Sequence, residues 1–284
     1  MANSDQNRLA EISAADAAGD TALIYGALEA TLGVRLVNLV YRHLATVPGA
    51  LEWTWAVVSG PFEQNIFAQK SVALVKMASH TPPAVRSSDI ANRLVAGLPE
   101  QDIKQIVDTI DGYNRANPMN ALSLNVVALA LEDERRASFV PPLESQNTAL
   151  KELLPLHSLD SLGGDTADVL SRLAVLTTGK PTPLVPSLYR HFVPWPDFLS
   201  RVEDWLENLS ESGEVDRLSE QVSNRAQEVA AEIYAGLEAA PENGDVPGQE
   251  IRESLVETIR LFPPTICRMI VIGGLLRHSL EGQD

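Results

Sequence analysis

Three pairs of matching segments divide the chain into two similar halves, and this repetition limits the possible folds more than any other feature. The pairs occur in the same order in both halves: GDTA at 19–22 and 164–167, LVNLVYRHL at 36–44 and LVPSLYRHF at 184–192, and IVDTIDGY at 106–113 and LVETIRLF at 255–262. The offsets between partners are 145, 148 and 149 residues, so they drift by only a few positions. Such regular self-similarity indicates an internal duplication of one structural unit.

The duplication predicts how the chain is divided. We expect a first repeat at 12–138, a connector at 139–150 and a second repeat at 151–284, each repeat having roughly 130 residues. The connector contains a Pro-Pro pair, and proline disfavours the continuation of a helix. Two copies of one unit can bury matching faces against each other, so we expect the repeats to pack as an internal pseudo-dimer.

The spacing of apolar residues predicts helices throughout. In the segment 215–237 they recur at steps of three, four and seven residues, which is typical of an amphipathic helix. The same pattern occurs at 21–32, 101–113, 121–131, 166–176 and 251–261. The Asp and Thr of each GDTA segment are placed to cap the helix that follows. Alternating β-branched runs are missing, so we expect an all-α fold.

Composition and net charge indicate which classes of binding partner and which cellular compartment to expect. The 284 residues are 45% hydrophobic, which is enough to bury a substantial core, and the net charge is −16. This charge repels nucleic acid and anionic membrane surfaces, so we expect neither as a partner. A site for a small organic acid would need its own local hydrogen-bond donors. The polar, acidic N-terminus and the lack of 18 consecutive apolar residues favour a soluble, cytoplasmic protein, and a homodimer remains an open alternative.

No cofactor motif is present. The five histidines, at 43, 80, 157, 191 and 278, lack the spacing that places two metal ligands on one helix face. Gly-rich phosphate loops are missing, and the single cysteine, Cys267, lies in an apolar run that is typical of a buried position. We therefore expect no metal and no cofactor.

Two asparagines form the most distinctive polar cluster. Asn114 and Asn117 lie one helical turn apart in the sequence YNRANPMN, just before an apolar segment. Such amides can hold a water molecule or a carbonyl group. Alternatively, the Asn-Pro pair marks a helix boundary and Asn117 acts as a cap, which residue preferences favour. However, the second repeat has Ile266 at the position that matches Asn117, so a structural need shared by both repeats does not explain the asparagine.

Two arginines at equivalent positions of the two halves allow two interpretations of their role. Arg42 and Arg190 occupy equivalent positions in the two Tyr-Arg-His segments. They are suited to receive the carboxylate of a substrate. Ion pairs with acidic neighbours are the more common use of such residues, and we favour that interpretation. The four tryptophans, at 53, 55, 195 and 205, are expected to pack in the core.

Four segments together resemble a known enzyme family. They are YRHLATVPGAL at 41–51, NRANPM at 114–119, LLPLH at 153–157 and WPDFL at 195–199. With them the chain resembles the group I 2-haloacid dehalogenase (DehI-type) family from about Ile12 to Gly282. The resemblance implies an all-helical fold of two repeats. It also implies hydrolysis of both enantiomers of 2-haloalkanoic acids by direct attack of water, in a pocket between the repeats. An aspartate then acts as general base and an asparagine, matched here by Asn117, holds the water.

The catalytic aspartate of that family has no counterpart here. Its position corresponds to Leu188, or to Ser187 if the alignment shifts by one, and residues 179–196 contain no Asp or Glu. Loss of a general base removes about two to four orders of magnitude of rate. Aromatic positions of the family's pocket correspond to Leu36 and Leu39. The resemblance thus implies a more aliphatic pocket formed by Asn114, Leu36, Leu39, Ser187 and Leu188 around Asn117.

Three functions remain open at this stage. In the first, the chain is a dehalogenase homologue that lacks the standard activity and binds or acts on a small organic acid or apolar molecule. In the second, it is an active hydrolase with a displaced base. In the third, it is a non-catalytic ligand-binding or structural protein. A binding protein predicts a closed aliphatic cavity with Asn117 as its polar contact. An enzyme predicts a buried carboxylate near Asn117. A purely structural protein predicts no cavity and an Asn117 that caps a helix.

Overall fold

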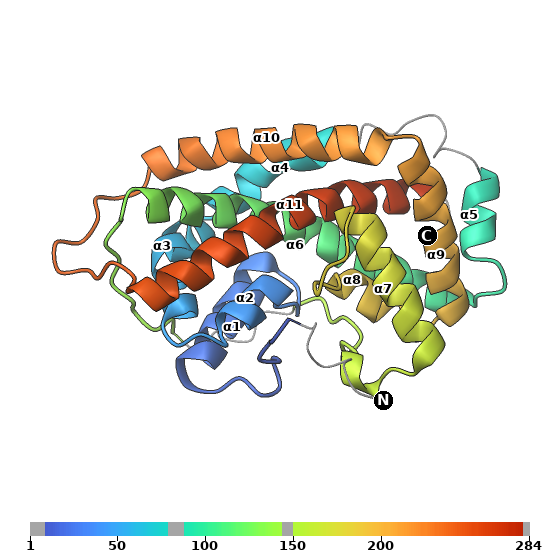
Figure 1. Ribbon diagram of the computed structural model, residues 1–284, viewed down its shortest axis with the longest axis horizontal. Helices are drawn as coiled ribbons and strands as arrows, with labels where there is room; N and C mark the ends of the chain where they lie inside the picture. The colour runs from blue at the N-terminus through green and yellow to red at the C-terminus, as the bar shows by residue number, and fades with distance from the viewer. Residues whose placement is uncertain (1–8, 79–87, 144–149, 281–284) are drawn as a thin grey trace.

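The computed structural model describes residues 9–78, 88–143 and 150–280 (Figure 1). Part of the expected connector, 144–149, and the end of the expected second repeat, 281–284, lie outside these ranges. The described residues form the following α-helices: α1 (Gly19–Leu32), α2 (Leu39–Leu44), α3 (Ala50–Glu63), α4 (Ile66–Ala78), α5 (Ser88–Leu94), α6 (Glu100–Glu132), α7 (Gly164–Thr178), α8 (Ser187–His191), α9 (Pro196–Glu211), α10 (Glu214–Ala235) and α11 (Gln249–Ser279). In these ranges β structure is limited to two isolated bridges, so the expected all-α class is confirmed.

The helices follow the same order in both halves. In sequence, α1, α2, α3, α4 and α6 correspond to α7, α8, α9, α10 and α11, while α5 has no counterpart among the described helices. Helices α1 and α7 both begin at the glycine of a GDTA segment, and α2 and α8 both contain Tyr-Arg-His. This order fits an internal duplication, which stays a prediction, as do the pseudo-dimer and the boundaries of the repeats.

The two longest helices, α6 and α11, cross at the centre of the molecule, and α4 and α10 lie against them on one side (Figure 1). Helix α11 is long and apolar enough to cross a membrane by length and composition alone, but 67% of its most apolar window is buried inside the protein. The core helix of a soluble protein has the same properties. All four tryptophans are buried, as expected for core residues.

Helix α6 differs from the expectation of two shorter helices. It continues from Glu100 to Glu132 through Pro118, and α11 likewise continues through Pro263 and Pro264. A proline inside a helix removes one backbone hydrogen bond, which normally ends the helix. Here most residues on both sides of Pro118 are buried, and this tertiary packing outweighs the local preference.

The expected helix caps in the GDTA segments are also wrong. The caps of α1 and α7 are Ala18 and Gly163, and neither makes a side-chain hydrogen bond to the helix. Asp20 and Asp165 instead lie in the first turn, where a negative charge interacts favourably with the helix dipole.

Candidate functional site

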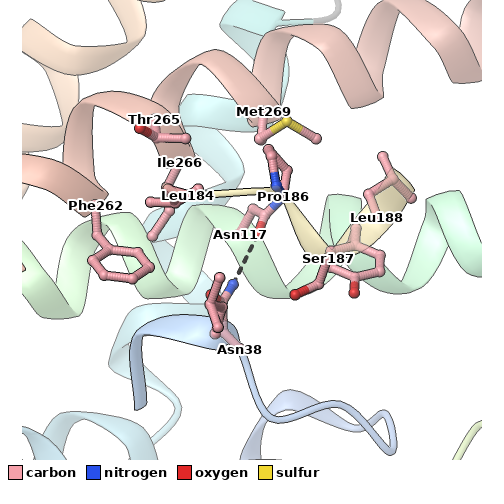
Figure 2. Close-up of a pocket in the computed structure, with 12 residues that line it drawn as sticks. Asn38, Asn117, Leu184, Pro186, Ser187, Leu188, Phe262, Thr265, Ile266 and Met269 are labelled. Carbon is pink, nitrogen blue, oxygen red and sulfur yellow. Dashed lines mark hydrogen bonds between the residues drawn. The ribbon is translucent and has the colours of Figure 1, made fainter. Parts of the chain in front are cut away.

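A small cavity lies where α2, α6, α8 and α11 meet (Figure 2). Its volume is about 30 Å³, and a cavity needs about 10–15 Å³ to hold a water molecule, so it has room for water and little more. Both halves of the chain contribute to its wall, which consists of Asn38, Leu39, Tyr113, Asn117, Leu184, Pro186, Ser187, Leu188, Phe262, Thr265, Ile266 and Met269. The cavity is therefore the place where the repeated segments face each other.

The lining residues include equivalent positions from the two halves. Offsets of 148 or 149 residues relate four pairs: Asn38 with Pro186, Leu39 with Ser187, Tyr113 with Phe262, and Asn117 with Ile266. In most pairs one half supplies a polar side chain and the other an apolar one. The cavity consequently combines a polar wall and an aliphatic wall, although both derive from similar segments.

Two asparagine side chains join across the polar wall. The Nδ2 of Asn38 donates a hydrogen bond of 3.1 Å to the Oδ1 of Asn117 (Figure 2). Asn38 is also the N-cap of α2, because its Oδ1 accepts a hydrogen bond from the backbone N–H of Val40. Asn117 lies in the middle of α6 and caps no helix, so the capping role that residue preferences favoured for it is wrong.

The structure brings four of the six expected site residues together. Asn117, Leu39, Ser187 and Leu188 all line the cavity. Leu36 is buried but is not part of this wall.

Asn114 faces a different cavity on another side of α6, together with Gly274 and Arg277 of α11. Its Nδ2 donates a hydrogen bond of 3.1 Å to the carbonyl of Gly273, so its visible role is to join α6 to α11.

Sequence reasoning missed eight lining residues: Asn38, Tyr113, Leu184, Pro186, Phe262, Thr265, Ile266 and Met269. The repeat contained a signal for several of them. Tyr113 and Phe262 end the third pair of matching segments, and residues 184–188 belong to the second pair. Asn38 also belongs to the second pair, but an asparagine before a short helix is fully explained as a cap, so nothing pointed to it as a wall residue.

The cavity wall contains no strong base. Among its described residues there is no Asp, Glu or His, and Leu188 is buried at the position where the resemblance places the base. The Ser187 hydroxyl accepts a hydrogen bond of 2.9 Å from Nη2 of Arg42. Burial raises the pKa of the Tyr113 phenol, while Arg42 and Ser187 partly oppose this change, so the phenol is neutral at pH 7. None of these groups takes a proton from water as a carboxylate does.

Arg42, Arg190 and Glu11 form a charged cluster next to Ser187. Nη1 of Arg190 donates a hydrogen bond of 2.7 Å to Oε1 of Glu11, and Nη2 of Arg42 lies 3.0 Å from Oε2 of the same carboxylate. The two equivalent arginines thus share one acidic neighbour, in agreement with the favoured ion-pair interpretation.

His191 is buried beside this cluster, and its ring contacts Tyr113 edge to face. Burial, together with the charges of Arg42 and Arg190, lowers the pKa of His191 to about 4. Its imidazole is therefore neutral at pH 7.

Among the residues that the structure describes, no three His, Cys, Asp or Glu side chains are grouped so that they could hold a metal ion. Cys267 is buried, and burial raises the pKa of its thiol to about 12. A buried, protonated thiol is a poor nucleophile and a poor metal ligand.

The same fold occurs in solved structures of D-2-haloacid dehalogenase. Three of them, a mutant in complex with D-2-CPA, a mutant alone and a complex with L-LA, each match with a TM-score of 0.73 and 15% sequence identity. The matches cover 97–98% of this chain and 97% of the other. No family model matches this chain, and no curated protein matches its sequence. At this identity the likeness shows a common all-α fold over almost the entire length.

Proposed function

We propose that the chain is a divergent 2-haloacid dehalogenase homologue that binds a small organic acid or apolar molecule in the cavity between its two repeats, without hydrolysing a haloacid. One observation carries the proposal: the cavity is lined by Leu188 and by no carboxylate among the described residues around it. Direct attack of water on a halogen-bearing carbon needs a base within hydrogen-bond reach of that water.

The polar wall supports binding of a ligand with one polar end. Asn38, Asn117, Tyr113 and Ser187 place amides and hydroxyls on one side, facing Ile266 and Met269. The Tyr113 hydroxyl is buried, and its interaction with the Ser187 hydroxyl lacks normal hydrogen-bond geometry. A poorly paired buried hydroxyl is destabilising, and a polar ligand atom or a water molecule would satisfy it.

The two alternatives have less support. For an active hydrolase, the carboxylate of Glu11 is a candidate base, but it contacts two guanidinium groups and is separated from the cavity by Arg42 and Ser187. For a purely structural protein we expected an Asn117 that caps a helix, whereas Asn117 bonds to the Asn38 side chain within the cavity wall. Since the cavity has room for little more than water, a three-carbon acid enters only if flexible wall residues such as Met269 move.

The test combines binding with turnover. The purified protein is titrated with D- and L-2-chloropropionate in a calorimeter, and chloride release is followed in the same samples. The proposal predicts binding without chloride release. Asn117→Leu removes the amide at nearly constant volume and is expected to weaken binding about tenfold, which corresponds to one lost hydrogen bond of about 1.4 kcal/mol.

Asn125→Leu is the matched control. Asn125 lies on the same helix, bonds to the carbonyl of Ala121 and does not line the cavity, so its replacement should leave binding unchanged. Chloride release by the wild-type protein would indicate a displaced base. A lack of binding to either enantiomer would favour the structural alternative.

A further inference from the structure

The arginine pair behind Ser187 is arranged as an anion-binding site. Arg42 of α2 and Arg190 of α8 come from equivalent positions 148 residues apart, and both side chains are buried. Their guanidinium groups converge on the two oxygens of Glu11, at 3.0 and 2.7 Å. Paired guanidinium groups are well suited to a carboxylate, because they offer several donors to its two oxygens.

Among the residues that the structure describes, this cluster carries one surplus positive charge. Guanidinium groups stay protonated in proteins, so two cations face the single carboxylate of Glu11. The other ionisable side chains that act on Arg42 are Tyr25 and Tyr113, and burial raises the pKa of both phenols, so neither supplies a negative charge at pH 7. An unbalanced buried charge is costly and attracts an anion from solution.

One donor of the cluster is unused within the described ranges. Nε of Arg42 is buried and has no hydrogen-bond partner among the described residues. The contact between Arg42 and Oε2 of Glu11 is an ion pair without hydrogen-bond geometry. Nη2 of Arg42 donates to Ser187, which is itself part of the cavity wall. Glu11 therefore satisfies Arg190 well and Arg42 incompletely.

Glu11 belongs to a non-helical segment at the edge of the core. It precedes the first helix, and its side chain is 23% exposed although both its arginine partners are buried. Three hydrogen bonds hold the neighbouring residues to the helices. The N–H of Ile12 donates to the carbonyl of Arg42 at 2.9 Å, and the hydroxyl of Tyr25 donates to the carbonyl of Ile12 at 3.0 Å. Nδ1 of His43 donates to the carbonyl of Ala10 at 2.8 Å. Local separation of such a segment requires far less free energy than global unfolding.

We propose that Arg42 and Arg190 form a binding site for the carboxylate of a small monocarboxylic acid, and that Glu11 occupies this site as an internal competitor in the free protein. The inference rests on the proposed function for the class of ligand, and it adds the location of the acid group. The carboxylate of the ligand replaces that of Glu11, and its carbon chain extends past Ser187 into the cavity. The site supplies local donors, which an acid-binding site needs in a protein with a net charge of −16.

The first experiment removes the competitor and uses formate and propionate as probes. An internal group on a short tether competes at millimolar effective concentration, so Glu11→Ala should bind formate at least about tenfold more tightly than the wild type. Formate has no carbon chain, so its binding reports on the arginines without requiring the cavity. The matched control is Glu152→Ala, which removes an exposed ion-pair partner of Arg35 and should leave formate affinity unchanged. Sodium chloride at equal ionic strength should not replace formate.

A second measurement uses the wild-type protein, so that it does not depend on whether Glu11→Ala folds. Propionate that displaces Glu11 should free the segment and speed hydrogen exchange of the Ile12 amide at least about fivefold, while amides in the centre of α6 should not change. Equal formate affinity in wild type and Glu11→Ala, together with unchanged exchange at Ile12, would overturn the inference and leave Glu11 as a structural ion-pair partner. An equal response to chloride would overturn the assignment to carboxylates.

The inference and the proposed function can fail separately. Binding of 2-chloropropionate that depends on Asn117, without any effect of Glu11→Ala on formate, would retain the cavity ligand and reject the arginine site. Tight formate binding by Glu11→Ala, without Asn117-dependent binding of 2-chloropropionate, would retain the arginine site and reject the cavity as the place of the carbon chain.

Discussion

His191 should make the free energy of unfolding decrease in mild acid. The buried imidazole has a folded-state pKa of about 4, because burial and the charges of Arg42 and Arg190 disfavour its protonated form. In the unfolded chain the pKa returns to about 6.5. Between these values the unfolded state binds a proton that the folded state does not, so stability falls as the pH decreases from 6.5 to 4 and is fully present above 6.5. A gap of about 2.5 pH units, at roughly 1.4 kcal/mol each, amounts to about 3 kcal/mol.

The test compares the wild type with His191→Phe, which retains a ring to pack against Tyr113 and cannot titrate. Urea unfolding at pH 7.5, 6.5, 5.5 and 4.5 gives the free energy of unfolding for each protein. Acidic groups contribute equally to both curves, so their difference isolates the histidine. We expect the wild type to lose about 2–3 kcal/mol more than the variant between pH 7.5 and 4.5. Parallel curves would show that His191 takes up its proton at the same pH in both states, and would refute this electrostatic description of the cluster.

Two further predictions concern helix packing and the thiol. A Cβ at Gly273 would lie 2.2 Å from Oδ1 of Asn114, so Gly273→Ala should displace that side chain and lower the free energy of unfolding by about 1–3 kcal/mol in urea. Gly274→Ala is the control, since its Cβ would meet Ala78 at an ordinary 3.5 Å; equal stability of the two variants would contradict the prediction. Cys267, with its thiol pKa raised to about 12 by burial, should react with a thiol reagent at pH 8 at least about a hundredfold more slowly in the folded protein than in urea. Rapid labelling of the folded protein would count against its placement in the core.

The all-helical class was predictable because apolar residues recur with the helical period in both halves of the chain. The length of α6 was not, since Pro118 and the preceding Asn117 favour a helix boundary locally. Only the packing of both ends of α6 in the core decides that the helix continues. The expected caps in the GDTA segments failed for a related reason, because the chain enters each helix one residue before the Asp.

The site was predictable where the repeat and the resemblance pointed to the same positions, as they did for Ser187 and Leu188. Asn114 and Asn117 looked equivalent because they lie one turn apart, but three residues of helix turn the side chain by about 60° from its starting direction. That rotation directs Asn114 toward Gly273 and Asn117 toward Asn38. The partner of the two arginines was also beyond sequence reasoning, because Glu11 reaches Arg190 across 179 residues.

The most direct test of this account is chloride release from D- and L-2-chloropropionate by wild type and Leu188→Asp, measured side by side. Aspartate is smaller than leucine, so the substitution adds a carboxylate to the cavity wall without overfilling it. If the missing base is what separates this protein from a dehalogenase, the wild type stays at the buffer rate and Leu188→Asp exceeds it by about a hundredfold or more. Chloride release by the wild type would contradict the account. So would a folded Leu188→Asp protein that binds the acid but releases no chloride.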